Sequence, residues 1–229
     1  SGKELFNLTM QELEPQADLS WHFSDGDTIT KTSVVCDIQG NLIDILKAER
    51  VALNFLGHLS GIATLTHTFV KQAKNIKILD TRKTLPLYRQ LEKQAVKDGG
   101  GYNHRMTLSD AILVKENHIR AMGSLEKAIK NIQANQPKAF IEVEVQTLAE
   151  AKEAAALGAQ RLLLDNMDNQ ALKSCIDALP ANIQTEASGN ITLERICKMD
   201  PLGVDYVSIG ALTHSAPCAD FSLLFHWHS

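Results

Sequence analysis

From Ile76 to Ile209, short apolar runs alternate with longer stretches in which apolar residues recur at helical spacing. The apolar runs predict six strands, at residues 75–80, 111–114, 140–145, 161–164, 183–186 and 204–209. The stretches between them predict helices at 85–97, 124–133, 148–157, 169–179 and 192–198, several of which stop at a glycine or a proline.

This order of elements predicts a parallel sheet, because strands that are not joined by hairpin turns pair through helical crossovers. The last four strands recur about every 20 residues, the spacing that βα units give in a closed α/β barrel. An open doubly wound sheet is the alternative, and the lack of a G-x-G-x-x-G motif after any strand disfavours it. We therefore expect an α/β fold built on a parallel barrel.

The two ends of the chain have a different pattern. A turn at Asp25-Gly26-Asp27 and a short strand at 34–38 precede a long helix, which is predicted at 50–65. The C-terminal residues 221–228 alternate or run apolar and predict one more strand. The simplest arrangement is a small β-rich element, built from both termini, beside the barrel.

Composition narrows the class of protein. A length of 229 residues allows one large domain or a barrel with a smaller partner, and 44% apolar with 22% charged residues is typical of a globular chain with a sizeable core. No apolar run approaches the ~18 residues of a membrane helix, and the start lacks the pattern of a signal peptide. The four scattered cysteines predict free, mostly buried thiols in a reducing compartment, so we expect a cytoplasmic protein.

Cationic side chains gather in one part of an acidic chain. The net charge is -4, yet six basic or imidazole groups fall within one stretch: Arg50, Arg82, Lys83, His104, Arg105 and Lys115. A pocket that collects cations in such a chain favours a small polyanion, whereas a nucleic-acid surface would require a broadly basic face. We therefore expect a small anionic ligand, with no nucleic acid and no membrane as partner.

Polar residues also end or follow each predicted strand. In chain order they are Thr81, Arg82 and Lys83; Lys115, Glu116 and Asn117; Glu144; Asp165 and Asn166; Ser188, Gly189 and Asn190; and Gly210 with Ala211 after Ile209. The carboxyl ends of barrel strands form the reactive face. Cations and carboxylates at one mouth predict an anionic substrate with a divalent metal, and the last two glycine-bearing loops are candidate phosphate sites.

Longer strings carry a family resemblance. They are residues 49–64 (ERVALNFLGHLSGIAT), Thr81–Thr84 (TRKT), the glycine-rich loop into Asn103-His104-Arg105, 114–118 (VKENH), 142–145 (EVEV), 163–167 (LLDNM), 186–190 (EASGN) and 209–214 (IGALTH). Together and in this order, the strings resemble the quinolinate phosphoribosyltransferase family over most of the chain.

The resemblance implies an incomplete α/β barrel at 56–214 and a small α/β-sandwich domain at 1–55, completed by about 215–229. Since family members begin upstream of these strings, Ser1 is expected to enter in the middle of the small domain. The resemblance also implies a homodimer, magnesium and a reaction. Quinolinate and phosphoribosyl pyrophosphate would give nicotinate mononucleotide, pyrophosphate and carbon dioxide in the de novo biosynthesis of NAD.

The site residues implied by the resemblance follow from the matched strings. Arg82, His104 and Arg105 would hold the two quinolinate carboxylates, with Arg50 entering from the partner subunit. Lys83, Lys115, Glu144 and Asp165 would surround the ribose and pyrophosphate as catalytic groups, Glu144 and Asp165 also as magnesium ligands. The loops Ser188-Gly189-Asn190 and Ile209-Gly210-Ala211 would take the 5′-phosphate, and Thr81 and His214 also fall among the substrate-binding residues.

Three alternatives stay open. The first is a related phosphoribosyltransferase-like protein of molybdenum metabolism, against which the pair Arg82 and Arg105 favours a dicarboxylate. The second is a Schiff-base aldolase with Lys83 or Lys115 as nucleophile. The third is a non-catalytic barrel that serves as a binding or assembly subunit. Among the remaining histidines, His58 and His67 are expected to be structural, and a metal site at His226 and His228 is not expected.

Overall fold

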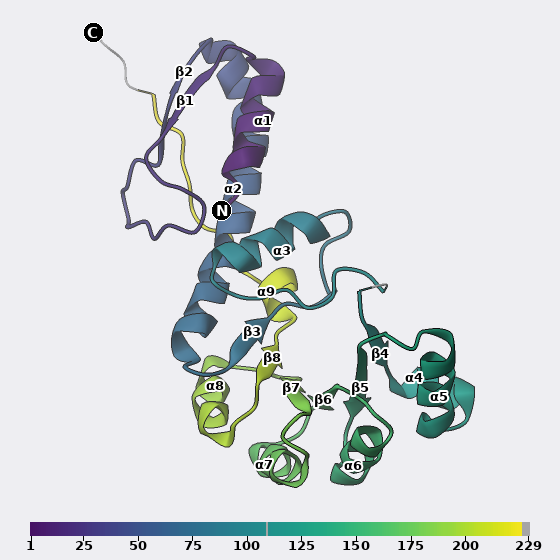
Figure 1. Cartoon of the computed structure of the whole chain (residues 1–229). Coiled ribbons are helices and arrows are strands. Elements are labelled where there is room, and N and C mark those ends of the chain that lie inside the picture. The colour runs from purple at the N-terminus through teal and green to yellow at the C-terminus, as the bar shows by residue number, and fades with distance from the viewer. Residues whose placement is uncertain (109, 226–229) are drawn as a thin grey trace. The chain divides into compact units, whose positions relative to one another are not determined.

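A six-stranded parallel sheet dominates the computed structural model, which describes residues 1–108 and 110–225 (Figure 1). Its strands are β3 (Lys77–Leu79), β4 (Ile112–Val114), β5 (Ile141–Val145), β6 (Arg161–Asp165), β7 (Gln184–Ser188) and β8 (Tyr206–Ser208). They follow the order β3-β8-β7-β6-β5-β4, and every hydrogen-bonded pair is parallel. The predicted α/β class and all six predicted strands are confirmed.

Helices connect these strands, and their start points follow from local capping chemistry. They are α4 (Glu116–Met122), α5 (Leu125–Asn135), α6 (Leu148–Ala156), α7 (Asn169–Ala178) and α8 (Leu193–Met199), followed by a short 3-10 turn, η1 (Asp200–Leu202). The side chains of Ser124, Thr147, Asp168 and Thr192 each accept a backbone N–H from the first turn of the helix that follows. Such caps satisfy amide donors that have no partner within the helix.

Strand β5 alternates between apolar and charged side chains although it is buried, and β7 carries polar side chains on both sides of Ala187. Val143 and Ala187 are fully buried apolar residues between charged or polar neighbours, and in β6 the fully buried Leu162 and Leu164 lie on either side of the apolar Leu163. Because successive side chains point to opposite faces, one face of the sheet carries an apolar layer. The other face carries the polar set of β5, β6 and β7: Glu142, Glu144, Arg161, Asp165, Glu186 and Ser188.

The chain divides into two compact units. One comprises Thr68–Lys83 and Gly101–Gly210 and contains the parallel sheet. The other comprises Ser1–His67, Thr84–Gly100 and the described part of Ala211–Ser229. The domain boundary predicted at residues 55 and 56 stays a prediction.

The second unit is built on helices and a two-stranded sheet. Its elements are α1 (Lys3–Leu13), β1 (Asp18–Trp21), β2 (Cys36–Gln39), most of α2 (Leu42–Gln72), α3 (Arg89–Asp98) and α9 (Ala211–His214). β1 and β2 are antiparallel, with Asp18 opposite Gln39. Phe6, Met10 and Ile45 belong to its buried core, against which Phe221 and Phe225 of the C-terminal segment pack. The expected small unit built from both termini is therefore present, but the expectation that it is rich in β-structure is wrong, because helices make up most of it.

Several boundaries differ from the sequence-based expectation. The helix predicted from residue 85 begins at Arg89, because Pro86 disfavours helical backbone at Leu85 and Leu87 is left-handed (φ +69°) and 99% exposed. The long helix covers Leu42–Gln72 rather than 50–65. The C-terminal strand is wrong for residues 221–225, which pack by side chain without strand pairing, and residues 226–228 lie outside the described residues.

The cysteines and the helices test the expected cytoplasmic location only in part. All four cysteines are free, but Cys175 alone is fully buried, so the expectation of mostly buried thiols is wrong. Among the described residues, no helix combines the length and the apolar character that a membrane span requires. The expected cytoplasmic location stays a prediction.

Candidate functional site

The carboxyl ends of the parallel strands carry most of the predicted site residues. Thr81, Arg82 and Lys83 follow β3, and Lys115 follows β4. Glu144 lies in β5, Asp165 ends β6, Ser188 ends β7, and Ile209 with Gly210 follows β8. Since these strands are parallel neighbours in one sheet, their carboxyl ends share one edge, as the sequence predicts.

Backbone pairing brings the His104–Arg105 turn to the same edge. Tyr102 donates its N–H to the carbonyl of Ile78 (2.8 Å) and accepts the N–H of Asp80 (3.1 Å), so this part of the loop lies along β3. The fully buried carboxylate of Asp80 then accepts the N–H of His104 at 2.9 Å. A loop that is distant in sequence is thereby fixed beside the Thr81–Lys83 turn.

Two guanidinium groups lie near each other in this turn. The Nε and Nη1 atoms of Arg82 are buried, and Nη1 of Arg105 donates to the carbonyl of Ala111 at 3.2 Å. Burial and, next, the positive charge of Arg82 lower the pKa of Arg105. Two cations that destabilise each other are stabilised when an anion binds between them. The arrangement suits a small ligand with more than one negative charge.

The acidic residues of this edge are already engaged within the chain. Oε2 of Glu144 lies 2.7 Å from Nζ of Lys115, and the Glu144 side chain is 17% exposed. Oδ1 of Asp165 accepts the Ser188 hydroxyl at 2.6 Å, and Oδ2 accepts the side-chain amide of Asn166 at 2.8 Å. These contacts orient both carboxylates while leaving them accessible.

The loop after β7 has a constrained backbone. Gly189 has φ +87° and Asn190 has φ +50°, both left-handed. A side chain at position 189 would be strained at this φ, and its Cβ atom would displace the Asn166 side chain and lie 3.2 Å from the Cα atom of Asn166, so the position favours glycine. Arg195 of α8 donates from Nη1 to the carbonyl of Gly189 at 2.6 Å and from Nη2 to the carbonyl of Met167. One arginine therefore ties the loop after β6 to the loop after β7.

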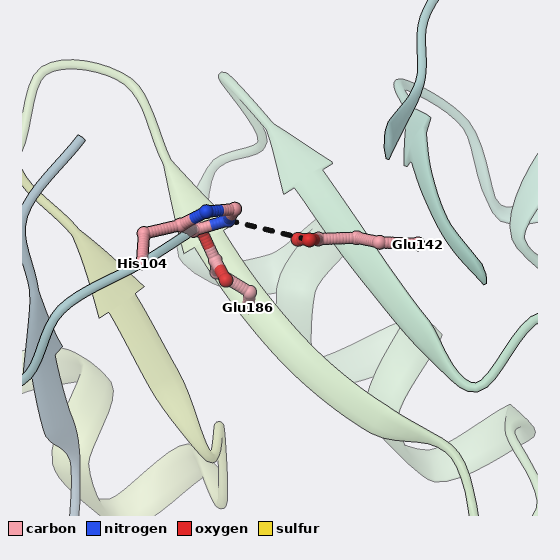
Figure 2. A group of neighbouring side chains, drawn as sticks. All are labelled: His104, Glu142 and Glu186. Carbon is pink, nitrogen blue, oxygen red and sulfur yellow. Dashed lines mark ion pairs between the residues drawn. The ribbon is translucent and has the colours of Figure 1, made fainter. Parts of the chain in front are cut away.

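A buried cluster that sequence reasoning missed lies on the polar face of the sheet. His104, Glu142 of β5 and Glu186 of β7 point toward one another (Figure 2). Nε2 of His104 lies 3.2 Å from Oε2 of Glu142 and 3.6 Å from Oε1 of Glu186. Arg161, at the start of β6, lies 3.4 Å from Oε2 of Glu186. The signal available in the sequence was a charged residue in the middle of each of two buried strands.

Burial and neighbouring charges alter the protonation of this cluster. Burial and, next, the charge of Glu142 raise the pKa of Glu186 to about 7. Burial alone would lower the pKa of His104, but the hydrogen bond to Glu142 and the charge of Glu186 outweigh it, and the net shift is upward. The Arg105 N–H opposes this shift, because it donates to Nδ1 of His104 at 2.8 Å and a ring protonated at Nδ1 could not accept it.

Three predicted site residues lie in the other compact unit, namely Arg50, Ala211 and His214. Arg50 is exposed on α2, and His214 ends α9, where its Nδ1 lies 2.6 Å from the Ser215 hydroxyl. His58 lies 2.9 Å from the fully buried carboxylate of Glu92. His226 and His228 lie outside the described residues.

Comparisons with known proteins identify the family. The family model for the quinolinate phosphoribosyl transferase C-terminal domain matches residues 62–224, and the model for the N-terminal domain matches 2–60. A probable nicotinate-nucleotide pyrophosphorylase (carboxylating) of Bacillus subtilis is 44% identical over 96% of this chain and 76% of its own. A mitochondrial quinolinate phosphoribosyltransferase (decarboxylating) 2a of Nicotiana tabacum is 40% identical over 97% of this chain and 69% of its own.

A solved structure agrees with the sequence matches. The crystal structure of NadC from Streptococcus pyogenes is 44% identical and superposes with a TM-score of 0.92, covering 97% of this chain and 80% of that one. The two domain models together match most of the sequence, and so do these relatives. The relatives are 40% to 44% identical, which is well above the level at which similarity indicates the fold alone. The chain belongs to the quinolinate phosphoribosyltransferase family.

Proposed function

We propose that this protein is a decarboxylating quinolinate phosphoribosyltransferase, a pentosyltransferase of NAD biosynthesis. It would transfer the phosphoribosyl group of phosphoribosyl pyrophosphate to quinolinate and release pyrophosphate and carbon dioxide. The family matches over nearly the whole chain support the activity. The observation that supports quinolinate as the substrate is the pair Arg82 and Arg105, two neighbouring guanidinium groups at the carboxyl edge of the sheet.

Quinolinate carries two adjacent carboxylates, and a guanidinium binds a carboxylate through two parallel hydrogen bonds in a way that a lysine does not. We assign Arg82 and Arg105 to these carboxylates, with the imidazole of His104 beside them. Arg50 would complete the cationic ring from the partner subunit of a homodimer. Its exposed position on α2 is compatible with a contact to another subunit.

The phosphoribosyl side would be bound by the remaining predicted residues. Lys83 and Lys115 are exposed cations suited to the pyrophosphate. Gly189 and Asn190 form a left-handed turn directly after β7, and such turns commonly bind anions through backbone N–H groups. This supports the proposal that Ser188-Gly189-Asn190 binds the 5′-phosphate together with Ile209-Gly210-Ala211. Thr81 and His214 remain proposed substrate contacts.

Magnesium is proposed as the metal, with Glu144 and Asp165 as candidate ligands alongside the substrate's phosphates. Both side chains offer carboxylate oxygens, the ligand type that a hard divalent cation prefers, and both are partly exposed. Bound there, the cation would supply charge to stabilise the leaving pyrophosphate oxygens. The chain's own part is to orient these carboxylates, through Lys115 for Glu144 and through Ser188 and Asn166 for Asp165.

The proposed chemistry requires positioning more than a protein nucleophile. The pyridine nitrogen of quinolinate forms the new bond to the anomeric carbon as the bond to pyrophosphate breaks. The developing positive charge on the ribose is stabilised by a carboxylate, for which Glu144 and Asp165 are candidates. The quaternised ring then accepts the electron pair left when the adjacent carboxylate departs as carbon dioxide, and that ring carbon takes a proton. The arginines orient the carboxylates for this loss.

A turnover assay tests the proposal against its alternatives. The chain is incubated with quinolinate, phosphoribosyl pyrophosphate and magnesium, and nicotinate mononucleotide and carbon dioxide are measured. We expect equal amounts of the two products. An aldolase would instead be trapped at Lys83 or Lys115 by borohydride with a carbonyl substrate, and a binding subunit would give no product. Either result would overturn the proposal.

A further inference from the structure

Both ring nitrogens of His104 make contacts within the chain. Nδ1 accepts the backbone N–H of Arg105 at 2.8 Å. Nε2 faces the carboxylates of Glu142 and Glu186, at 3.2 and 3.6 Å (Figure 2). Because Nδ1 acts as an acceptor, the proton of the neutral ring lies on Nε2 and is donated toward these carboxylates. The contacts therefore assign the ring both an orientation and a tautomer.

The two carboxylates are among the most deeply buried charged groups in the described part of the chain. The side chains of Glu142 and Glu186 are 1% and 0% exposed. The Oε1 atom of each is buried and accepts no hydrogen bond from the described residues. Burying such acceptors costs free energy. Their placement around one N–H group indicates that they act on His104.

A metal ion is not required to explain this cluster, although one nitrogen and two oxygens lie within 4.8 Å of one another. The guanidinium of Arg161 is 3.4 Å from Oε2 of Glu186, and it also donates to the side chain of Gln184 at 2.8 Å. Arg161 thus supplies a positive charge beside Glu186, and the His104 imidazole contacts both carboxylates, where a metal ion would otherwise bind. The cluster is better described as a support for the ring.

That support extends to the backbone of the proposed quinolinate site. Asp80 fixes the N–H of His104, and the His104 ring fixes the N–H of Arg105. Two consecutive amides of the turn are therefore held by side chains. If the ring rotated or changed tautomer, the second amide would lose its acceptor, and the backbone of Arg105 would no longer be held; only the contact of its Nη1 with the Ala111 carbonyl would then orient the guanidinium.

We propose that Glu142 and Glu186 are positioning residues that hold His104 in the Nε2–H tautomer and thereby fix Arg105 for dicarboxylate binding. The substrate part of this statement rests on the proposed function. The orientation and tautomer of the ring stand on the contacts alone, so the two parts can be tested separately.

The ring is tested first, in the unmodified chain. Two-bond 15N–1H correlations of His104 at pH 8 should show a protonated Nε2 and an unprotonated Nδ1. A proton on Nδ1 in the neutral ring would overturn the proposal. This measurement needs no turnover, so it still tests the cluster if the chain neither binds nor converts quinolinate, a result that would count against the proposed function instead.

The functional part compares Glu142→Gln with Glu142→Leu. The amide oxygen of glutamine can still accept the Nε2–H, whereas leucine leaves that donor buried without its acceptor, an effect worth about 10- to 100-fold. We expect E142L to raise the KM for quinolinate by about this factor. The KM for phosphoribosyl pyrophosphate should stay within about threefold, and E142Q should restore most of the loss.

Controls separate positioning from general destabilisation. Val143→Ala removes buried volume from the opposite face of the same strand and should leave both KM values unchanged. Glu186→Leu should act in the same direction as E142L but more weakly, because its contact is longer. The proposal would be overturned if E142L raised the KM values for quinolinate and for phosphoribosyl pyrophosphate equally. It would also be overturned if the KM for quinolinate were as high in E142Q as in E142L. If E142L does not fold, the proposal is tested by two measurements that do not need it: the KM of E142Q for quinolinate and the histidine spectrum of the unmodified chain.

Discussion

Replacing the buried Glu186 by glutamine should change how stability depends on pH. The carboxyl is 0% exposed, and burial together with the charge of Glu142 raises its pKa to about 7. Near neutral pH, the folded chain therefore holds a proton that the unfolded chain releases. Glutamine has the shape of the protonated acid and cannot ionise, so Glu186→Gln removes this titration while keeping the packing.

The size of the effect follows from the two pKa values. A pKa of about 7 in the folded chain against an ordinary value of 4.5 corresponds to about 3 kcal/mol. Since the folded value is the higher one, this contribution to stability is fully present below pH 4.5 and is lost as pH rises through 7. The raised pKa of His104 acts with the same sign, and part of it depends on Glu186.

The assay is urea unfolding, followed by circular dichroism at pH 5 and at pH 8. The free energy of unfolding of E186Q relative to the unmodified chain should rise by about 2 to 3 kcal/mol between these two values. The control is Glu153→Gln on the exposed face of α6, whose difference from the unmodified chain should be the same at both pH values. Parallel pH profiles for E186Q and the unmodified chain would refute the reasoning.

Three further predictions concern the proposed site. Arg105→Ala should weaken quinolinate binding in calorimetry with little change in magnesium demand, whereas Asp165→Ala should mainly impair the phosphoribosyl pyrophosphate step; equal loss of quinolinate binding would contradict this division. Gly189→Ala should raise the KM for phosphoribosyl pyrophosphate at least about tenfold, because a Cβ there would displace the Asn166 side chain, and an unchanged KM would exclude this loop from the phosphate site. Arg50→Ala and Arg105→Ala, each inactive alone, should regain up to half of the unmodified activity per heterodimer after subunit exchange; confirmed exchange without recovery would place Arg50 in its own chain's site.

The strands were predictable because their signal is local. Short β-branched runs such as Phe140–Val145, bounded by breakers and separated by helical periodicity, have few alternatives to buried parallel strands. Helix α4 was missed because its seven residues bury no side chain and therefore show no apolar stripe. Residues 221–225 have the alternation of a strand, but that pattern reports burial of side chains and does not supply a backbone partner.

The same division applies to the site. Motifs at the strand ends, such as Thr81-Arg82-Lys83 and Asp165-Asn166, could be identified because each is contiguous. The cluster of His104 with Glu142 and Glu186 could not, since it depends on a loop lying along β3 and on the register of β5 and β7 within the sheet. A charged residue in the middle of a buried strand indicates that it has a partner, but the partner itself can be identified only from the fold.

The central claim is that Arg82 and Arg105 form a site for a dicarboxylate. It is tested most directly by comparing kcat/KM for quinolinate and for nicotinate, which has a single carboxylate, at saturating phosphoribosyl pyrophosphate. Nicotinate leaves one arginine without its anion in a desolvated pocket, so quinolinate should be favoured by about 10⁴-fold. Comparable values of kcat/KM for the two acids would contradict the account.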